Sequence, residues 1–334
     1  MSDKPEAILH RWRRHGSAGA TEEEIATLLS CPPQGGLFFQ LLAASDARSR
    51  TCFGSRGYVF AQIGLNAEPC SKNCAFCSMG GSHYSMDERW KKDIPQMNRE
   101  ILLLLEQGID DLFLMTTADF PQDEVLRYFE AARAILPDTV RLVANIGDLD
   151  RHTARRLRDC GCNGAYHIRR LREGRDTGIP PEDREATLAA LNDAGLDIYY
   201  CLEPIGPEHD PAELARELIF ARSLHPQAMA AMRRVPVPGT PLAGQGRISA
   251  LELTKIVAVT NLVVEPSRCM NVHEPMQMPL LAGVNQLYAE SGANPRDTQS
   301  RTEEGRGFTP AAAWELLAEG GWFPPAASPS VEER

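Results

Sequence analysis

The fold is decided by the central stretch of residues 111–146, which reads DLFLMTTADFPQDEVLRYFEAARAILPDTVRLVANI. A β-rich run over Asp111–Thr117 precedes an amphipathic segment near residues 122–136, and a second β-rich run follows over Val140–Ile146. Strand-like runs that alternate with helical segments of this length are typical of βαβ units, whose strands pair in parallel. The stretch therefore predicts a parallel sheet covered by helices.

The same alternation continues on both sides of this stretch. Further strands are expected over Tyr58–Leu65, Gly164–Ile168, Asp197–Pro204, Ala228–Val235, Pro266–His273 and Gln286–Glu290. Further helices are expected near residues 96–108, 150–159, 182–194, 211–224, 249–263 and 276–283. Two of them end at the helix-stopping glycines Gly108 and Gly195. Eight strands in this order predict an α/β fold, a (β/α)8 TIM-type barrel, with an open doubly wound sheet as the alternative.

The chain divides into three expected parts. Residues 1–50 predict an N-terminal helical extension, with helices over Glu6–His15 and Thr21–Leu29 and with Thr21 and Glu24 placed as a capping box. Residues 51–323 form the expected barrel. Residues 324–334 are rich in Pro, Ser and Glu and are expected to be disordered.

Composition excludes several classes of partner. The chain has 334 residues, and 35 Lys and Arg against 45 Asp and Glu give a net charge of −10. That charge argues against binding to nucleic acid or to anionic lipid. No apolar run approaches the roughly 18 residues of a membrane span, and the segment Met1–Pro5 lacks the layout of a signal peptide. We therefore expect a cytoplasmic protein, in which cysteine patterns indicate metal or redox chemistry.

Three of the nine cysteines are crowded into the segment Glu68–Cys77, EPCSKNCAFC, directly after the expected strand at 58–65. Cys70, Cys74 and Cys77 form a Cys-x3-Cys-x2-Cys pattern. Structural zinc usually takes four ligands in paired units, and no second pair stands at that spacing here. Three thiolates on one loop can instead hold a 4Fe–4S cluster with one iron left open. A zinc knuckle or unrelated buried cysteines are the alternative.

The pattern resembles the cluster motif of the radical S-adenosylmethionine (SAM) superfamily. The resemblance implies that Cys70, Cys74 and Cys77 bind a 4Fe–4S cluster and that Phe76 flanks the adenine of SAM. It further implies that the amino and carboxyl groups of SAM bind the open iron. Reductive cleavage of SAM then gives methionine and a 5′-deoxyadenosyl radical, which abstracts a hydrogen atom from the substrate.

Four further stretches resemble the biotin synthase-like group, which also holds methylornithine synthase, the hydrogenase maturase related to it and the iron-hydrogenase cofactor maturase. They are residues 48–54, 166–177 with 181–184, 203–209 and 234–242. The resemblance extends from about residue 45 to 323 and implies a complete (β/α)8 barrel. The active site of such a barrel lies at the C-terminal ends of its strands.

The resemblance implies a set of residues around SAM. Thr116 and Thr117 follow the second strand, where relatives contact the amino group of SAM, although strand propensity alone could explain both threonines. Arg184 matches an arginine that grips the SAM carboxylate, with a solvated helix charge as the alternative. His167 and Arg172 stand where relatives make ribose and carboxylate contacts.

A second set is expected to bind the substrate. Arg234 ends the sixth strand, at the position that binds an amino-acid carboxylate in methylornithine synthase. The alternative is a salt bridge within the barrel, for example to Glu203. Asn271, His273 and Glu274 could complete a polar pocket, although a lone histidine is more often structural.

The other cysteines argue against sulfur insertion. Biotin synthase holds a second cluster, and the positions that match its cysteines lie near Leu114, Val143 and Tyr199. Cys201 and Cys269 alone are a poor cluster site, and Cys160 and Cys162 precede a strand at the far end of the barrel. We therefore expect a single cluster.

These observations predict a radical SAM enzyme that acts on a small polar metabolite, an amino acid or a cofactor precursor. Rearrangement or fragmentation of a carbon skeleton is the expected reaction, and flavodoxin or ferredoxin is the expected type of reducing partner. Sulfur insertion with a second cluster, and a non-catalytic metal-binding protein, remain as alternatives.

Overall fold

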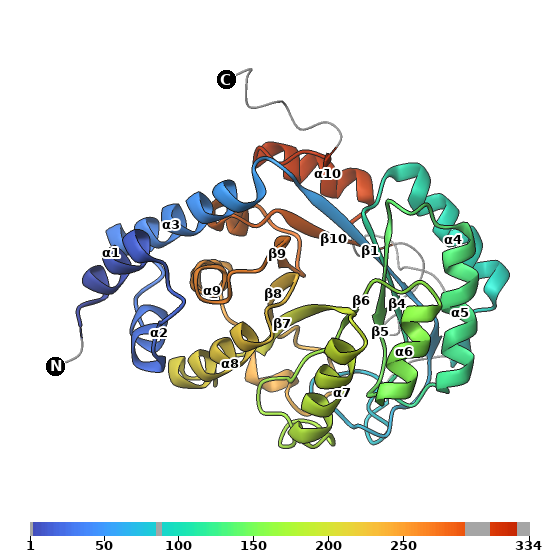
Figure 1. Cartoon of the computed structure of the whole chain (residues 1–334). Helices are drawn as coiled ribbons and strands as arrows, with labels where there is room; N and C mark the ends of the chain where they lie inside the picture. The colour runs from blue at the N-terminus through green and yellow to red at the C-terminus, as the bar shows by residue number, and fades with distance from the viewer. Residues whose placement is uncertain (1–2, 85–88, 291–307, 326–334) are drawn as a thin grey trace.

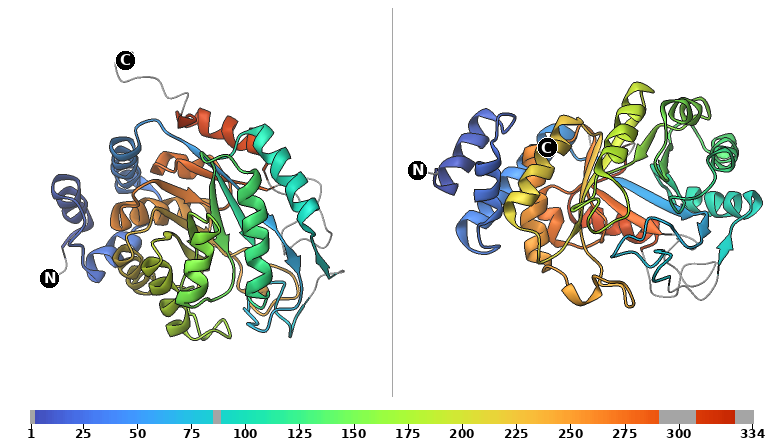
Figure 2. Two further views of the ribbon diagram at one scale, coloured as in Figure 1. Left: turned by 45° about the vertical axis from the view of Figure 1, so that its right-hand side comes forward. Right: turned by 90° about the horizontal axis from the view of Figure 1, so that it is seen from below.

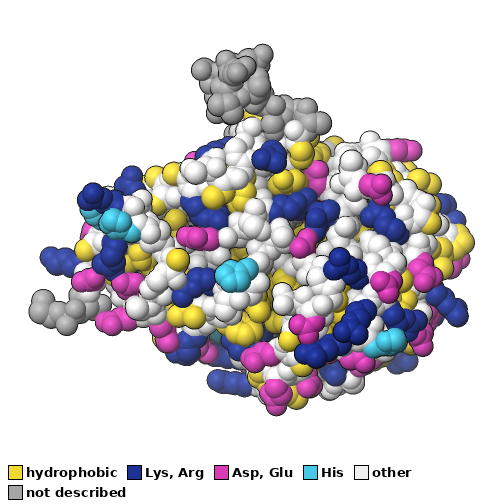
Figure 3. Space-filling view, viewed as in Figure 1, with side chains coloured by type: hydrophobic (Ala, Val, Ile, Leu, Met, Phe, Trp, Pro, Cys, Tyr) yellow, Lys and Arg dark blue, Asp and Glu magenta, His cyan; other side chains and the backbone are white. Residues whose placement is uncertain are grey.

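A computed structural model describes residues 3–84, 89–290 and 308–325. Of the tail that was expected to be disordered, residues 326–334 lie outside this described part. Within the described residues, no helix is both long enough and apolar enough to span a membrane. On the face shown in Figure 3, acidic and basic side chains are interspersed.

Eight parallel strands close into a barrel (Figure 1). The strands are β1 (Tyr58–Gly64), β4 (Asp111–Met115), β5 (Arg141–Asn145), β6 (Gly164–Tyr166), β7 (Asp197–Ile205), β8 (Ala228–Arg233), β9 (Cys269–Val272) and β10 (Gln286–Glu290). Closure is seen at β1, where Phe60 pairs with Tyr288 of β10 on one side and with Asp111 of β4 on the other. The predicted TIM-type barrel is therefore confirmed, and the doubly wound alternative is wrong.

Helices cover the outside of the barrel. They are α4 (Ile94–Gln107), α5 (Gln122–Ile135), α6 (Arg151–Asp159), α7 (Pro181–Asp193), α8 (Pro211–Ser223), α9 (Ala250–Val264) and α10 (Pro310–Glu319), with 3-10 turns η1 (Ala243–Gln245) and η2 (Met278–Ala282). The segment expected to be helical near 276–283 is the turn η2, and α10 was not predicted. Side chains cap five of these helices by accepting a backbone N–H in the first turn, and they belong to Asp93, Asp150, Asp210, Ser249 and Thr309.

The N-terminal extension consists of α1 (Pro5–His15), α2 (Glu22–Leu29) and α3 (Gly35–Phe53), which flank α8 and α9 (Figures 1 and 2). The predicted capping box is present, because Thr21 and Glu24 exchange hydrogen bonds between side chain and backbone. Asn261 of α9 donates to the hydroxyls of Ser45 and Ser49 on α3, both of which are buried. The extension shares one hydrophobic core with the barrel, and the division at residue 50, which falls inside α3, stays a prediction.

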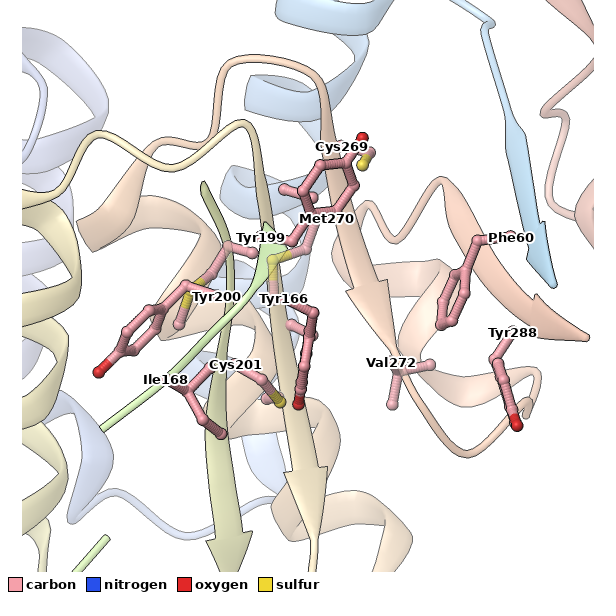
Figure 4. Packing of buried hydrophobic residues seen from close by; sticks show 14 of the residues in the cluster. Phe60, Tyr166, Ile168, Tyr199, Tyr200, Cys201, Cys269, Met270, Val272 and Tyr288 are labelled. Atoms are coloured by element: carbon pink, nitrogen blue, oxygen red, sulfur yellow. The ribbon is translucent and has the colours of Figure 1, made fainter. Parts of the chain in front are cut away.

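The lower part of the barrel interior is filled. Arg268 donates to the buried carboxylate of Asp111 at 2.7 Å, and Gln286 donates to the same oxygen at 2.6 Å. Above them, the rings of Phe60 and Phe113 stack with centroids 4.5 Å apart. Figure 4 shows the buried aromatic side chains, Tyr166, Tyr199 and Tyr288 among them, that continue this packing. The space left inside the barrel therefore lies toward the C-terminal ends of the strands.

Candidate active site

A cavity of about 250 Å³ lies at the C-terminal ends of the strands. Residues on or just after all eight strands line it, together with residues of the loop that follows β1. Part of its wall is polar, because Asn145 donates to the side-chain oxygen of Gln62 at 3.0 Å. This is the end of the barrel at which a (β/α)8 enzyme carries its active site.

The cysteine loop forms the rim of this cavity. It follows the short strand β2 (Asn66–Ala67), which pairs with β3 (Trp90–Lys91). The N–H of Cys70 donates to the carbonyl of Met79 at 2.7 Å, and the N–H of Cys77 donates to the carbonyl of Cys74 at 3.0 Å. These bonds close the loop into a compact turn, and all three cysteines line the cavity.

A histidine braces the same loop. The ring of His83 lies 2.9 Å from the carbonyl oxygen of Cys77 and 3.2 Å from that of Cys74, both measured from Nε2. A Cβ at position 80 would overlap this ring, so that Gly80 is what allows His83 to approach. These contacts help to hold the backbone of the cysteine loop in place.

The three thiols fit a cluster better than a single ion. Among the described residues, one group of three possible ligand atoms lies within 4.8 Å of one another, and it contains Cys201 instead of the loop cysteines. The three loop thiols are therefore farther apart than that. Ligands of one tetrahedral zinc ion would lie that close together, because each Zn–S bond is about 2.3 Å long. A cubane spaces its thiolates more widely, since each binds its own iron. Burial raises the pKa of the Cys74 thiol to about 12, and iron binding would displace that proton.

The two threonines after β4 differ in their freedom to bind a ligand. The backbone N–H of Thr117 donates to Asn66, and its hydroxyl accepts from the same amide, both at 2.9 Å. The hydroxyl of Thr116 is buried and has no hydrogen-bond partner among the described residues. Both residues line the cavity, and Thr116 is the one with an unused hydroxyl.

Arg184 extends from α7 into the wall of the cavity, where its side chain is 5% exposed. Its Nη1 donates to Asp148 at 2.9 Å, and its Nε lies 3.4 Å from Glu173 without a hydrogen bond. Burial alone would raise the pKa of Asp148, but His167 and Arg184 outweigh it and lower that pKa to about 2. The arginine is therefore already balanced by a carboxylate.

His167 also lines the cavity, with Nε2 3.2 Å from the Asp148 carboxylate. Burial lowers its pKa, which favours the neutral ring. Arg172 is placed differently, because its guanidinium makes a two-pronged pair with Glu213 at 2.8 and 2.9 Å. A third bond to the carbonyl of Glu208 completes that contact, so the structure does not bring Arg172 to the cavity.

Arg234 lies at the cavity directly after β8 and is 1% exposed. Both of its terminal nitrogens pair with Glu208, and Nη2 also donates to the carbonyl of Gly246 at 3.0 Å. The salt-bridge partner is thus Glu208 rather than Glu203. A side chain at Gly206 would overlap this pair. The Nε of Arg234 is buried and has no hydrogen-bond partner in the described chain.

The three residues expected to complete the substrate pocket at the end of β9 lie in different places. His273 lines the cavity. Asn271 is buried in β9 and donates to Gln286 at 3.3 Å, and Glu274 pairs with Arg233. Of these three residues, the structure places His273 alone in the cavity wall.

No family model matches the chain. It is 25% identical over 306 residues to biotin synthase from Desulforudis audaxviator, covering 86% of this chain and 91% of that one. It is 24% identical over 271 residues to biotin synthase from Ehrlichia canis, covering 75% and 82%. These likenesses support the radical SAM superfamily, in its biotin synthase-like group, as the family that this chain resembles. The chain is an enzyme of the radical SAM type.

Solved structures share the fold of this radical SAM enzyme. The hydrogenase maturase HydG superimposes with a TM-score of 0.81 at 18% identity, covering 99% of this chain and 77% of the HydG chain. Methylornithine synthase (PylB) gives a TM-score of 0.80 at 18% identity, covering 95% and 97%. The likeness to this group implies a 4Fe–4S cluster and SAM, a small-molecule substrate and an electron-donating partner.

One arginine of the cavity, Arg170, was not predicted from the sequence. Arg170 lines the cavity, its Nε is 3.4 Å from Glu203, and its guanidinium is 6.0 Å from the centre of the Phe76 ring. Burial would lower the pKa of Arg170, but Glu203 and Cys74 help to raise it. The motif at 166–177 holds several arginines, and only the tertiary structure shows which one faces Phe76.

The remaining cysteines are dispersed. Strand pairing aligns Cys201 with Asn271 through Ala230, whereas Cys269 is level with Tyr199, two residues lower in the barrel. Cys269 donates to Gln286 at 3.3 Å, and Cys162 donates to the carbonyl of Gly164 at 3.1 Å. The two thiols considered for a second cluster therefore lie at different levels of the barrel.

Proposed function

We propose that Cys70, Cys74 and Cys77 hold one 4Fe–4S cluster and that this enzyme abstracts a hydrogen atom from a small polar metabolite. The substrate class is an amino acid or a cofactor precursor, and the outcome is rearrangement or fragmentation of its carbon skeleton. The observation that supports this proposal is the position of the three thiols, on one braced turn at the rim of a cavity in the barrel. When bound and reduced, the cluster supplies the electron for cleavage of SAM.

The protein's own residues would orient SAM against that cluster. Phe76 and His167 both line the cavity, where the ring of Phe76 can pack against the adenine and His167 can hydrogen-bond to the ribose. The buried, unused hydroxyl of Thr116 can accept a hydrogen bond from the SAM ammonium group. Arg184 keeps donors beyond the one given to Asp148, and these can reach a carboxylate.

The substrate side of the cavity carries charges of both signs. The unpartnered Nε of Arg234 can donate to a carboxylate, and Glu203, which lines the same cavity, can accept from an ammonium group. His273 and Tyr166 add polar atoms to the same cavity. Such a wall suits a zwitterion, which supports an amino acid or a relative of one as the substrate.

Sulfur insertion is the second candidate, because the curated relatives named above are biotin synthases. The different levels of Cys201 and Cys269 weigh against a second cluster. The two candidates differ in sulfide content, since a second cluster adds sulfide as well as iron.

The test is reductive cleavage of SAM by the anaerobically reconstituted chain. Wild type should form 5′-deoxyadenosine, and replacing Cys70, Cys74 or Cys77 by Ala should abolish both the cluster spectrum and that product. Cys52→Ala, at an exposed thiol of α3, is the matched control and should retain both. A loop variant that keeps an intact cluster and forms 5′-deoxyadenosine would refute the assignment of the cluster ligands.

A further inference from the structure

Three different metal-binding groups meet inside the barrel, away from the cysteine loop. The Sγ of Cys201, a carboxylate oxygen of Glu203 and a ring nitrogen of His273 all lie within 4.8 Å of one another. Cys201 and Glu203 stand two residues apart on β7, so that they share the inward face of the strand. His273 directly follows β9, and Ala230 of the intervening β8 is level with Cys201 and with Asn271, two residues before His273.

Neighbouring side chains hold these three groups in place. The hydroxyl of Tyr166 donates to Glu203 at 3.0 Å. The ring of His273 packs against those of Tyr166 and Phe60, with centroids 5.3 and 5.7 Å apart. Figure 4 shows the side chains of Cys201 and Tyr166 extending side by side from neighbouring strands. Such outer contacts orient ligands in metal sites and contribute to their affinity.

We propose that Cys201, Glu203 and His273 bind a single divalent transition-metal ion of the Zn²⁺ or Fe²⁺ type. Thiolate, imidazole and carboxylate together suit these cations, whereas Mg²⁺ and Ca²⁺ take oxygen ligands and leave thiols unbound. Three protein ligands leave a coordination position for a small molecule. That position faces the cavity, because Glu203 and His273 both line it.

The short distances among its ligand atoms distinguish this site from the cysteine loop. Atoms within 4.8 Å of one another can share one ion, as the loop cysteines do not. The site therefore adds a second anchor, at which a substrate oxygen, nitrogen or sulfur atom would be held deeper in the barrel. The Nε of Arg170 lies 3.4 Å from Glu203, so a bound cation must tolerate this like charge beside one of its ligands. The binding proposal does not depend on the radical reaction.

The test uses the full chain with Cys70→Ala, Cys74→Ala and Cys77→Ala, which removes the cluster ligands. Titration of this metal-free variant with Co²⁺ should give a thiolate-to-cobalt charge-transfer band that saturates near one cobalt per chain and disappears on addition of Zn²⁺. Adding Cys201→Ala should abolish the band. Glu203→Gln and His273→Ala should each weaken cobalt binding by at least about tenfold. Cys269→Ala and Cys162→Ala are the matched controls at buried thiols and should leave the titration unchanged.

Absence of the band in the parent variant, its survival in Cys201→Ala, or its equal loss in Cys269→Ala would overturn the proposal. Circular dichroism and thermal unfolding check that each variant is folded. If the triple variant does not fold, the cluster-loaded wild type is dialysed against Co²⁺ and its cobalt content measured. About one cobalt per chain, lost in Cys201→Ala, supports the site, and no bound cobalt refutes it. Loss of SAM cleavage with intact cobalt binding would count against the proposed function alone.

Discussion

Replacement of Arg184 by Gln tests whether this arginine grips SAM or only neutralises a carboxylate. The side chain is 5% exposed, so that water replaces a lost hydrogen bond poorly. Nη1 already donates a hydrogen bond to Asp148. The variant should therefore lose one further charge-assisted hydrogen bond, the one from Arg184 to the SAM carboxylate. Such a bond contributes about 1.5–3 kcal/mol. We expect Arg184→Gln to raise the Kd for SAM by about 10-fold to 100-fold.

The single variant also leaves the half-buried carboxylate of Asp148 and the buried carboxylate of Glu173 without this cation, which would weaken binding by disturbing the fold. The double variant Arg184→Gln/Asp148→Asn removes one charge of each sign and keeps the local balance. If Arg184 binds SAM, the double variant should bind SAM as weakly as the single one. If Arg184 only neutralises Asp148, the double variant should regain affinity.

The assay is calorimetric titration of SAM into each anaerobically reconstituted variant. The pair Arg234→Gln and Arg234→Gln/Glu208→Gln is the matched control, because Arg234 is the other buried cavity arginine with a carboxylate partner. Both control variants should bind SAM like wild type and lose turnover of the substrate. The reasoning fails if the Arg184 double variant binds SAM normally while the Arg234 variants do not.

Three further measurements test the site. Reconstituted protein should contain about four sulfide per chain, unchanged in Cys201→Ala and Cys269→Ala, and a higher sulfide content that falls in these variants would indicate a second cluster. Gly80→Ala should lower cluster loading, because its Cβ would overlap the ring of His83, whereas Gly244→Ala, with open space around it, should load normally. Asp148 has a pKa of about 2, below its ordinary value, so it stabilises the fold above pH about 4 and loses this effect as the pH falls toward 2. At neutral pH, the free energy of urea unfolding of the cluster-free chain should exceed that of its Asp148→Asn variant by up to about 2 kcal/mol. If the pKa of Asp148 is lowered as stated, this difference should shrink below pH about 4.

The barrel strands could be predicted from the sequence because each is a short apolar run between helices with clear ends. Errors occurred where a strand passes into a loop. The run expected over Asp111–Thr117 ends at Met115, and the one expected over Pro266–His273 begins only at Cys269. The β-branched Thr116 and Thr117 extend the strand-like run at the first place, and Pro266 begins the expected run too early at the second, without joining the sheet. The two-residue strands β2 and β3 are too short to produce any period, and α10 was overlooked although Thr309 caps it.

The site could be predicted in part, because the cysteine spacing is local but the charge partners are not. Arg184 and Arg234 were both expected at the cavity, and both line it. Their partners, Asp148 and Glu208, come from other loops of the barrel, and nothing in the sequence pairs them. Arg172 was expected near SAM instead of Arg170, because neighbouring arginines of one loop point in different directions once it is folded.

The paired arginines constrain which ligands the cavity can accept. A buried guanidinium without a partner is costly before a ligand arrives, and Asp148 and Glu208 remove that cost at Arg184 and Arg234. A ligand with only a carboxylate would bring a second negative charge against each pair. A ligand that carries an ammonium group beside its carboxylate adds no net charge and can satisfy both members of a pair. The amino-acid end of SAM has that arrangement, apart from the positive sulfonium farther along the molecule, and so has any α-amino acid. We therefore expect amino acids to protect the barrel against thermal unfolding, whereas the matching carboxylic acids without the amino group should not, and equal protection by both would contradict the role given to these pairs.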